Sequence, residues 1–152
     1  MRQRSGLVAD ALVDLNRAIE LNPNRTEALA EIGECQDQLR NLPAALDAYT
    51  RATAARPDNA FWWYRLGRLH MDADHAGPAA PALARATELG DAMAEAPIWL
   101  LDAHRLAGDA LRLNRDRAGA IAHFQRYLAL APSGHPDMGH VRGALRDLGV
   151  EE

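Results

Sequence analysis

Lysine is absent from this 152-residue sequence, and all 17 basic side chains are arginine. They are outnumbered by 21 acidic residues, and the net charge of −4 has the wrong sign for a protein that binds nucleic acid through its phosphates. Aromatic residues make up only 5% of the chain, and no segment alternates β-branched or aromatic residues with polar ones as a half-buried strand does. A composition dominated by alanine, leucine and arginine therefore predicts an all-α fold.

Long apolar runs are missing as well. No segment approaches the ~18 apolar residues of a membrane-spanning helix. The N-terminal residues, from Met1 to Gly6, lack the apolar core of a signal peptide. We therefore expect no membrane insertion and a cytoplasmic location.

Residues that could carry chemistry are few. The single cysteine, Cys35, cannot form an internal disulfide, and no Cys/His spacing is typical of a zinc site. The six histidines form no His-x-x-x-His or His-Glu-x-x-His pair, and His70 and His104 occupy apolar positions where core packing is expected. There is no glycine-rich phosphate loop and no nucleophile motif. The sequence predicts no catalytic residues, no metal, no cofactor and no enzyme activity.

One pattern of small and large residues returns along the chain, first with a spacing of 34 residues. Its four copies are Ala11, Leu15, Ala18 and Pro23; Ala45, Tyr49, Ala52 and Pro57; Ala79, Leu83, Ala86 and Asp91; and Ala120, Phe124, Tyr127 and Pro132. A second element precedes each later copy: Leu29, Ile32 and Gly33; Trp63, Leu66 and Gly67; and His104, Ala107 and Gly108. A period of this length indicates a repeat architecture.

Each repeat reads as a pair of helices. Apolar residues three and four apart form one helix face, the glycine and alanine positions let two antiparallel helices approach closely, and proline after an apolar run ends the helix. Hairpins this small bury their faces only by stacking. Over nearly its whole length the chain resembles the tetratricopeptide repeat family. That resemblance implies a right-handed α-solenoid whose first helices line a concave groove.

We expect one domain over residues 1–152, built of about three full repeats. Its parts are a partial first repeat over 1–25, repeats over 26–59, 60–93 and 94–134, and a capping helix over 135–152. The expected helices lie near residues 6–21, 26–39, 43–55, 60–73, 77–89, 94–113, 117–130 and 135–148.

The chain departs from the family pattern in two places. Ala79 and Ala120 are 41 residues apart, so seven residues are added. Seven residues make about two helical turns, and we expect them to extend the start of the helix at 94–113. Trp99 in this overhang has two readings, packing against the preceding hairpin or the last helix, or an aromatic anchor for a partner. At the other end, the helix at 6–21 has no pairing helix before it, which predicts self-association or a longer array.

The groove is predicted to have an acidic part and an aromatic and arginine part. Its candidate binding residues are Glu27, Glu31, Glu34, Phe61, Tyr64, Arg65, Arg68, Arg105, Asp109 and Arg112. Such a surface suits a peptide with a basic side chain, an apolar anchor and a carboxylate for Arg65 or Arg68. We expect Trp63 to fill a large core position and Trp62 to face a neighbouring hairpin. The carboxylate clamp of chaperone-binding family members is not expected, because lysine is absent and Glu31 or Glu34 stands where its residues would be sought.

The predicted function is that of a protein-interaction scaffold or adaptor, whose partner is a protein or peptide bound in the groove. The alternative is a structural segment of a larger or self-associating repeat array without a peptide groove function of its own. Enzyme activity would require a catalytic domain elsewhere in a longer chain.

Overall fold

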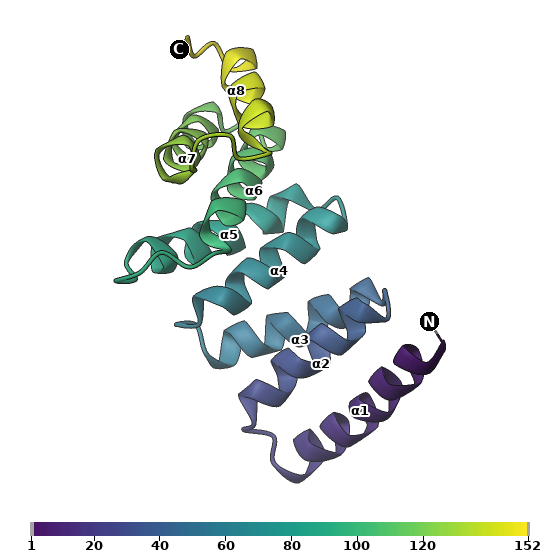
Figure 1. The fold of residues 1–152 in the computed structure, drawn as a ribbon. Coiled ribbons are helices and arrows are strands. Elements are labelled where there is room, and N and C mark those ends of the chain that lie inside the picture. Colours follow the sequence, from purple (N-terminus) through teal and green to yellow (C-terminus); the bar gives the residue numbers. More distant parts are fainter. Residues whose placement is uncertain (1, 152) are drawn as a thin grey trace.

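The computed structural model describes the backbone of residues 2–151 and the side chains of residues 4–151. Within that part of the chain all regular structure is α-helical, which confirms the all-α prediction (Figure 1). The helices are α1 (Arg2–Leu21), α2 (Thr26–Gln38), α3 (Leu42–Ala55), α4 (Ala60–Asp72), α5 (Ala76–Asp91), α6 (Leu100–Leu113), α7 (Arg117–Leu130) and α8 (Met138–Asp147). No helix in the described part is both long and apolar enough to cross a membrane.

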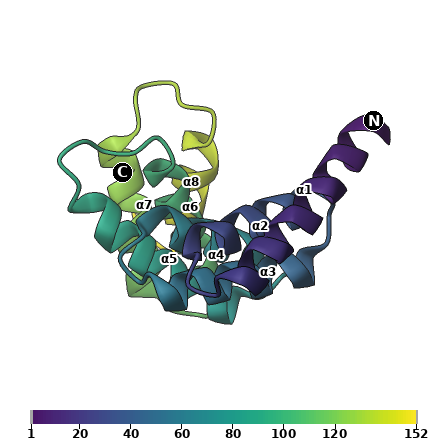
Figure 2. The same cartoon turned by 90° about the horizontal axis from the view of Figure 1, so that it is seen from below.

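The helices stack in chain order, each packing mainly on its sequence neighbours. Figure 1 shows the stack running from α1 at one end to α7 and α8 at the other, and Figure 2 shows that it curves into an arc. The pairs α2 and α3, α4 and α5, and α6 and α7 form the hairpins. Helix α4 also contacts α6, so the first helices of the last two hairpins lie next to each other.

A glycine in the first helix of each hairpin faces a large residue of the second helix. A Cβ added at Gly33 would come within 2.6 Å of the Tyr49 ring, and one added at Gly108 would come within 2.6 Å of the Phe124 ring. Gly67 faces Leu83 in the same way. Because only a residue without a side chain permits this approach, the repeated glycine sets the distance between the two helices.

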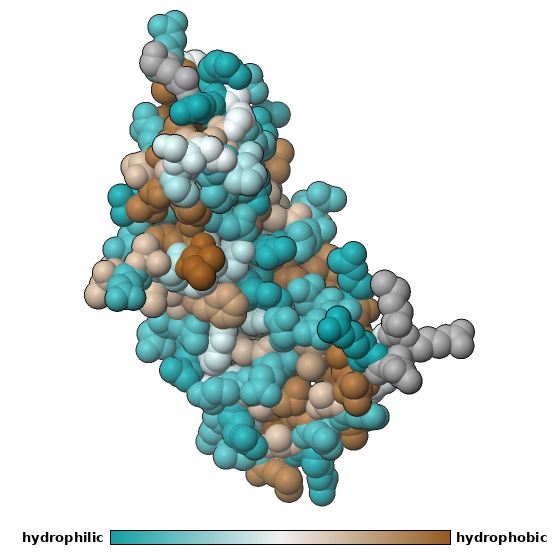
Figure 3. Space-filling view, in the orientation of Figure 1, coloured by the Kyte–Doolittle hydropathy of each residue, from teal (hydrophilic) through white to brown (hydrophobic). Residues whose placement is uncertain are grey.

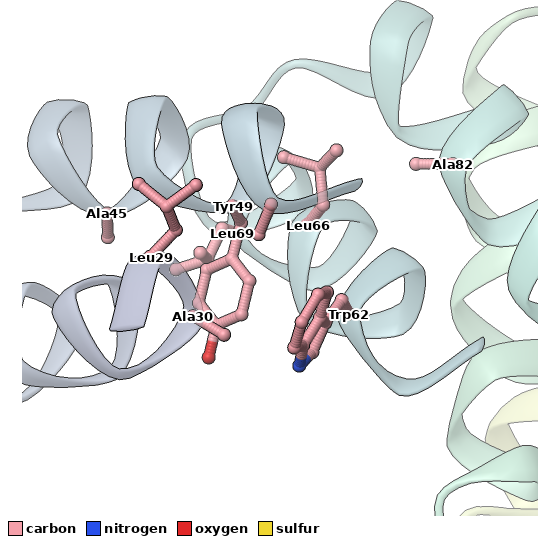
Figure 4. Packing of buried hydrophobic residues seen from close by; sticks show 9 residues of the cluster. Leu29, Ala30, Ala45, Tyr49, Trp62, Leu66, Leu69 and Ala82 are labelled. Atoms are coloured by element: carbon pink, nitrogen blue, oxygen red, sulfur yellow. The ribbon is translucent and has the colours of Figure 1, made fainter. Parts of the chain in front are cut away.

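The core consists of several linked clusters along the stack. In one of them Leu29 of α2 and Tyr49 of α3 pack with Trp62, Leu66 and other residues of α4. Figure 4 shows that Tyr49 and Trp62 lie side by side, although they belong to different hairpins. Burial of such large side chains between successive hairpins joins the repeats into one structure, at roughly 25 cal/mol for each Å² of apolar surface removed from water.

The turns inside the three hairpins share an unusual backbone conformation. Arg40, Asp74 and Arg115 each follow the first helix and have φ values of 61°, 57° and 64°. In each turn, the next residue's N–H bonds back to a carbonyl five positions earlier, as from Asn41 to Gln36. This hydrogen-bond pattern ends a helix through a left-handed residue, a position that glycine usually fills.

The seven additional residues do not extend a helix, and that prediction was wrong. Helix α5 continues to Asp91 and α6 begins only at Leu100, so residues 92–99 form an irregular connection. Pro97 accounts for part of this, because a proline disfavours helical backbone at the residue before it. Gly90 accounts for another part, since a Cβ there would lie 2.7 Å from Leu100 Cδ1 and 3.1 Å from the Trp99 ring. The connection therefore folds back onto the end of α5.

The two terminal helices also differ from expectation. Helix α1 begins at Arg2, earlier than residue 6, and α8 begins at Met138, later than residue 135. Pro136, which lies inside the helix expected near residues 135–148, therefore precedes α8. Val141, Ala144 and Leu145 of α8 are buried in a cluster with residues of α7.

Candidate functional site

The predicted binding residues lie on the first helices of the hairpins, α2, α4 and α6. We call the surface that these helices form with α8 the even-helix surface. Its side chains project from neighbouring helices of different repeats, so oppositely charged groups meet across the repeat boundaries. Most of the charged residues predicted from the sequence are engaged in such contacts.

Arg65 of α4 bridges to α2. Its Nη2 atom lies 2.7 Å from Glu34 Oε2 and 3.0 Å from Asp37 Oδ2, and its side chain is only 16% exposed. The guanidinium also lies 5.7 Å from the centre of the Tyr49 ring. Burial raises the pKa of Tyr49 to about 12, with Arg65 acting in the opposite direction. Arg65 is thus already neutralised, and the predicted acidic and arginine parts of the groove are joined rather than separate.

The other acidic candidates on α2 differ in their surroundings. Glu27 Oε1 accepts a hydrogen bond from Arg56 Nη1 at 2.6 Å, across the hairpin. Glu31 is exposed and has no ion pair or side-chain hydrogen bond within the described residues. Arg68 of α4 is also exposed, and its Nη1 atom lies 3.5 Å from the Tyr64 hydroxyl. Among the described residues, Glu31 and Arg68 are therefore the predicted charges that are exposed and form no ion pair.

Tyr64 was expected to face the groove, and the structure buries it. It is only 5% exposed, and its hydroxyl donates a hydrogen bond to Asp102 Oδ2 of α6 at 2.6 Å. Burial, followed by the hydrogen bond and the charge of Asp102, raises its pKa to about 12. Trp99 covers it, with the two rings stacked at 5.3 Å and 18°. Sequence reasoning placed Tyr64 on the correct helix face and missed that the connection after α5 covers this face.

The neighbouring aromatic residues divide between core and surface. Phe61 is 42% exposed and lies 6.3 Å from Trp99, ring centre to ring centre. Trp62 is buried against the preceding hairpin, as predicted. Trp63 is only partly buried, where it packs against two clusters and donates from Nε1 to the carbonyl of Pro57 at 2.9 Å. Trp99 adopts the first of its two predicted readings, because it packs on an earlier hairpin.

The candidates on α6 form bridges toward α8. Arg105 pairs with Asp102 and Asp109 on its own helix and with Asp137, just before α8, at 3.6 Å. Asp109 Oδ1 lies 2.9 Å from His140 Nε2 of α8. Arg112 is flanked by Asp109 at 3.9 Å and Asp147 at 4.0 Å. These three residues connect the last repeat to the final helix.

A second polar cluster was not predicted. His104, 3% exposed, lies with Nε2 3.1 Å from Asp91 Oδ2 and with Nδ1 3.0 Å from His123 Nδ1. Arg126 donates to the other oxygen of Asp91. Burial lowers the pKa of both histidines, and the nearby His104 lowers that of His123 further. Within the described residues no group of His, Cys, Asp and Glu side chains is arranged to hold a metal.

The exposed side of α1 carries apolar residues. Leu12 is buried against α2 and α3, whereas Leu7, Val13 and Leu21 are exposed. A hollow of about 600 Å³ lies between the start of α1 and the end of α2, with Leu7 and Leu39 in its lining. The predicted self-association through this helix stays a prediction.

Comparison with known proteins places this geometry in context. A tetratricopeptide repeat family model matches residues 2–60. No curated protein matches the chain in sequence.

Solved structures match the fold over most of the chain. They include YrrB, described as a tetratricopeptide repeat protein with an unusual peptide-binding site, at 22% identity and a TM-score of 0.81, covering 99% of this chain and 74% of that one. MamA matches at 18% identity and a TM-score of 0.80, covering 97% of this chain and 82% of its own. The first repeat domain of Spaghetti, bound to a peptide of HSP90, matches at 18% identity and 0.68, covering 83% and 94%.

Proposed function

We propose that this chain is a non-enzymatic scaffold that binds a partner protein or peptide on the even-helix surface. A tetratricopeptide repeat family model matches residues 2–60, and tetratricopeptide repeat structures such as YrrB share the fold over nearly the whole chain. Support comes from the exposed charges of Glu31 and Arg68, which stand beside charges that are paired across repeats, such as Arg65 with Glu34 and Asp37. Similar proteins that hold peptides, such as YrrB and the Spaghetti domain, add support from fold alone.

The paired residues contribute rigidity. Arg65 connects α2 to α4, the Tyr64 hydroxyl connects α4 to α6, and Arg105 connects α6 to the residues before α8. A surface held in one shape loses little conformational freedom when a partner binds, so more of the contact energy appears as affinity. Glu31 and Arg68 supply charges of both signs on that surface, which favours a partner with complementary charges.

The test is quantitative affinity capture with wild-type protein and three charge-reversed variants. Glu31→Lys alters the even-helix surface without touching the bridges, and Arg68→Glu removes the 3.5 Å contact of Nη1 with the Tyr64 hydroxyl but replaces neither Tyr64 nor Asp102. Arg85→Glu on α5 is the matched control, because among the described residues Arg85 pairs only with Glu88 on its own helix. We expect partners to be recovered by wild type and Arg85→Glu and lost from the other two. Equal recovery by all four proteins contradicts the proposal.

A second function is supported by a separate observation. We propose that α1 joins copies of the chain, since Leu7, Val13 and Leu21 expose apolar side chains on the helix that ends the stack. Light scattering over a wide concentration range tests this directly. The average molar mass should rise with concentration for wild type. For the double variant Leu7→Asp and Leu21→Asp it should equal the mass of a monomer at every concentration. A strictly monomeric wild-type protein contradicts it.

A further inference from the structure

The connection after α5 forms one wall of a hollow of about 330 Å³ at the edge of the stack. We call it the loop pocket. Its apolar lining consists of Phe61 from α4, Leu89 from α5, and Met93 and Trp99 from the connection. Figure 3 shows apolar surface beside this part of the molecule. Met93 and Trp99 belong to the segment lengthened by the seven residues that exceed the 34-residue period, so the pocket depends on that insertion.

Contacts with residues outside the lining hold the walls of the loop pocket in place. Trp99 is stacked on Tyr64, which is anchored through its hydroxyl to Asp102. The other wall begins at Asn59, whose side chain accepts a hydrogen bond from the Trp62 N–H at 3.1 Å and so fixes the start of α4. A preformed pocket requires little ordering when it is filled.

The lining offers apolar surface to solvent. Phe61 and Met93 are 42% and 51% exposed, and Ile98, next to Trp99 in the connection, is 99% exposed. An isoleucine wholly in water beside an open aromatic pocket has no role in the packing of the domain. The volume suits one large apolar side chain of a partner, with Ile98 available to contact the flanking residues.

The charge around the loop pocket determines which residues should flank a bound apolar side chain. Arg56 in its lining is neutralised by Glu27 at 2.6 Å, and its guanidinium lies 5.5 Å from the centre of the Trp62 ring. Asp58 in the lining and Glu95 in the connection have no ion pair within the described residues. The unpaired charge at this edge is therefore negative, which attracts cations beside the apolar group.

We propose that the loop pocket binds an apolar side chain of a partner peptide whose neighbouring residues are basic. The proposal rests on the proposed function, because it names the partner chemistry of the same scaffold. Phe61, Met93 and Trp99 hold the apolar side chain, and Asp58 and Glu95 attract the basic residues on either side of it.

The test uses three pools of synthetic peptides that share one length and a Gly/Ser background. The first has the fixed centre Lys-Φ-Arg, where Φ is a mixture of Leu, Ile and Phe; the second has Glu-Φ-Glu; the third has Lys-Ala-Arg. Methyl-labelled methionine reports the location of binding by NMR, because Met93 lines the pocket while Met138 packs against the last cluster. Only the first pool should shift the Met93 signal. The other two pools should bind at least about tenfold more weakly.

Two variants complete the experiment. Met93→Ser removes an exposed side chain from the lining and should weaken the first pool about tenfold. Leu113→Ser, which changes another exposed apolar residue (64%, against 51% for Met93) at the end of α6, should leave binding unchanged. Circular dichroism verifies that both variants fold.

Three outcomes overturn the loop pocket proposal: no pool binds, the acidic pool binds as well as the basic one, or binding leaves the Met93 signal in place. If one of these occurs while Arg68→Glu and Glu31→Lys still lose captured partners, the proposed function stands and the pocket proposal fails. If the first pool binds at Met93 while those variants capture normally, the scaffold function stands with the loop pocket as its binding site, and the even-helix surface is refuted as that site.

Discussion

Replacement of Gly108 by alanine tests whether the close approach of paired helices holds the stack together. A Cβ at this position would overlap Phe124 Cε1 and lie 2.6 Å from Cδ1 and 2.8 Å from Cζ. Phe124 is fully buried and its ring is rigid, so it cannot move aside without disturbing Tyr127 and Val141 in the same cluster. The helices must separate or the ring must leave its preferred rotamer.

Gly143→Ala in α8 is the matched control. Its Cβ would meet nothing closer than Arg146 Nη2 at 4.0 Å. Alanine is better than glycine in a helix by about 1 kcal/mol at both positions. Overpacking destabilises the Gly108→Ala variant by about 1–3 kcal/mol and does not affect Gly143→Ala. The free energies of unfolding of the two variants should therefore differ by about 1–3 kcal/mol, which for a chain of this length lowers the Tm of Gly108→Ala by roughly 2–12 °C relative to the control.

Thermal unfolding followed by circular dichroism measures this difference. Combining Gly108→Ala with Phe124→Leu should recover part of the loss, because the smaller side chain leaves room for the new methyl group. If Gly108→Ala is as stable as Gly143→Ala, the glycine does not set the helix spacing, and the packing account of the repeat is wrong.

Asp74→Gly should stabilise the protein by about 0.5–1 kcal/mol in urea unfolding, because glycine adopts the positive φ without strain; an unchanged or lower stability contradicts this. Tyr64→Phe removes the hydrogen bond to Asp102 and should cost about 1 kcal/mol, with faster amide exchange in residues 92–99 as the second readout. Stability should also fall as the pH drops below about 6.5, where the histidines of an unfolded chain begin to bind protons. Burial lowers the pKa values of His104 and His123 in the folded protein, so these two residues take up protons in the unfolded state first, and acidification stabilises the unfolded state relative to the folded one. Unfolding curves between pH 5 and 8 should show this slope for wild type and a weaker one for His123→Gln; a flat wild-type profile rules it out.

The helical hairpins could be predicted from the sequence because they depend on local spacing. Gly33, Gly67 and Gly108 stand at fixed distances from Tyr49, Leu83 and Phe124, so the contact partners follow from the period alone. A strict pattern of this kind leaves few alternatives for which faces are buried.

The candidate site was predicted less well, because it depends on how repeats sit against each other. Arg65 belongs to one repeat and Glu34 and Asp37 to another, and their pairing is set by the angle between hairpins, which no spacing rule contains. The burial of Tyr64 follows from the path of residues 92–99, a segment without periodicity. The contact of Asp91, at the end of α5, with His104 of α6 likewise joins two repeats, so the spacing within one repeat did not indicate it.

The bridges of the even-helix surface have a mechanical consequence. Each bridge joins successive units of the stack, so together the bridges resist a change in the curvature of the arc. Salt screens the charges of exposed pairs most, and it weakens the Arg65 pair less because the Arg65 side chain is only 16% exposed. A cationic ligand that drew Glu34 away from Arg65 would weaken the connection between α2 and α4. Binding on the even-helix surface would then change the curvature of the stack, and the distance between its two ends would change with it.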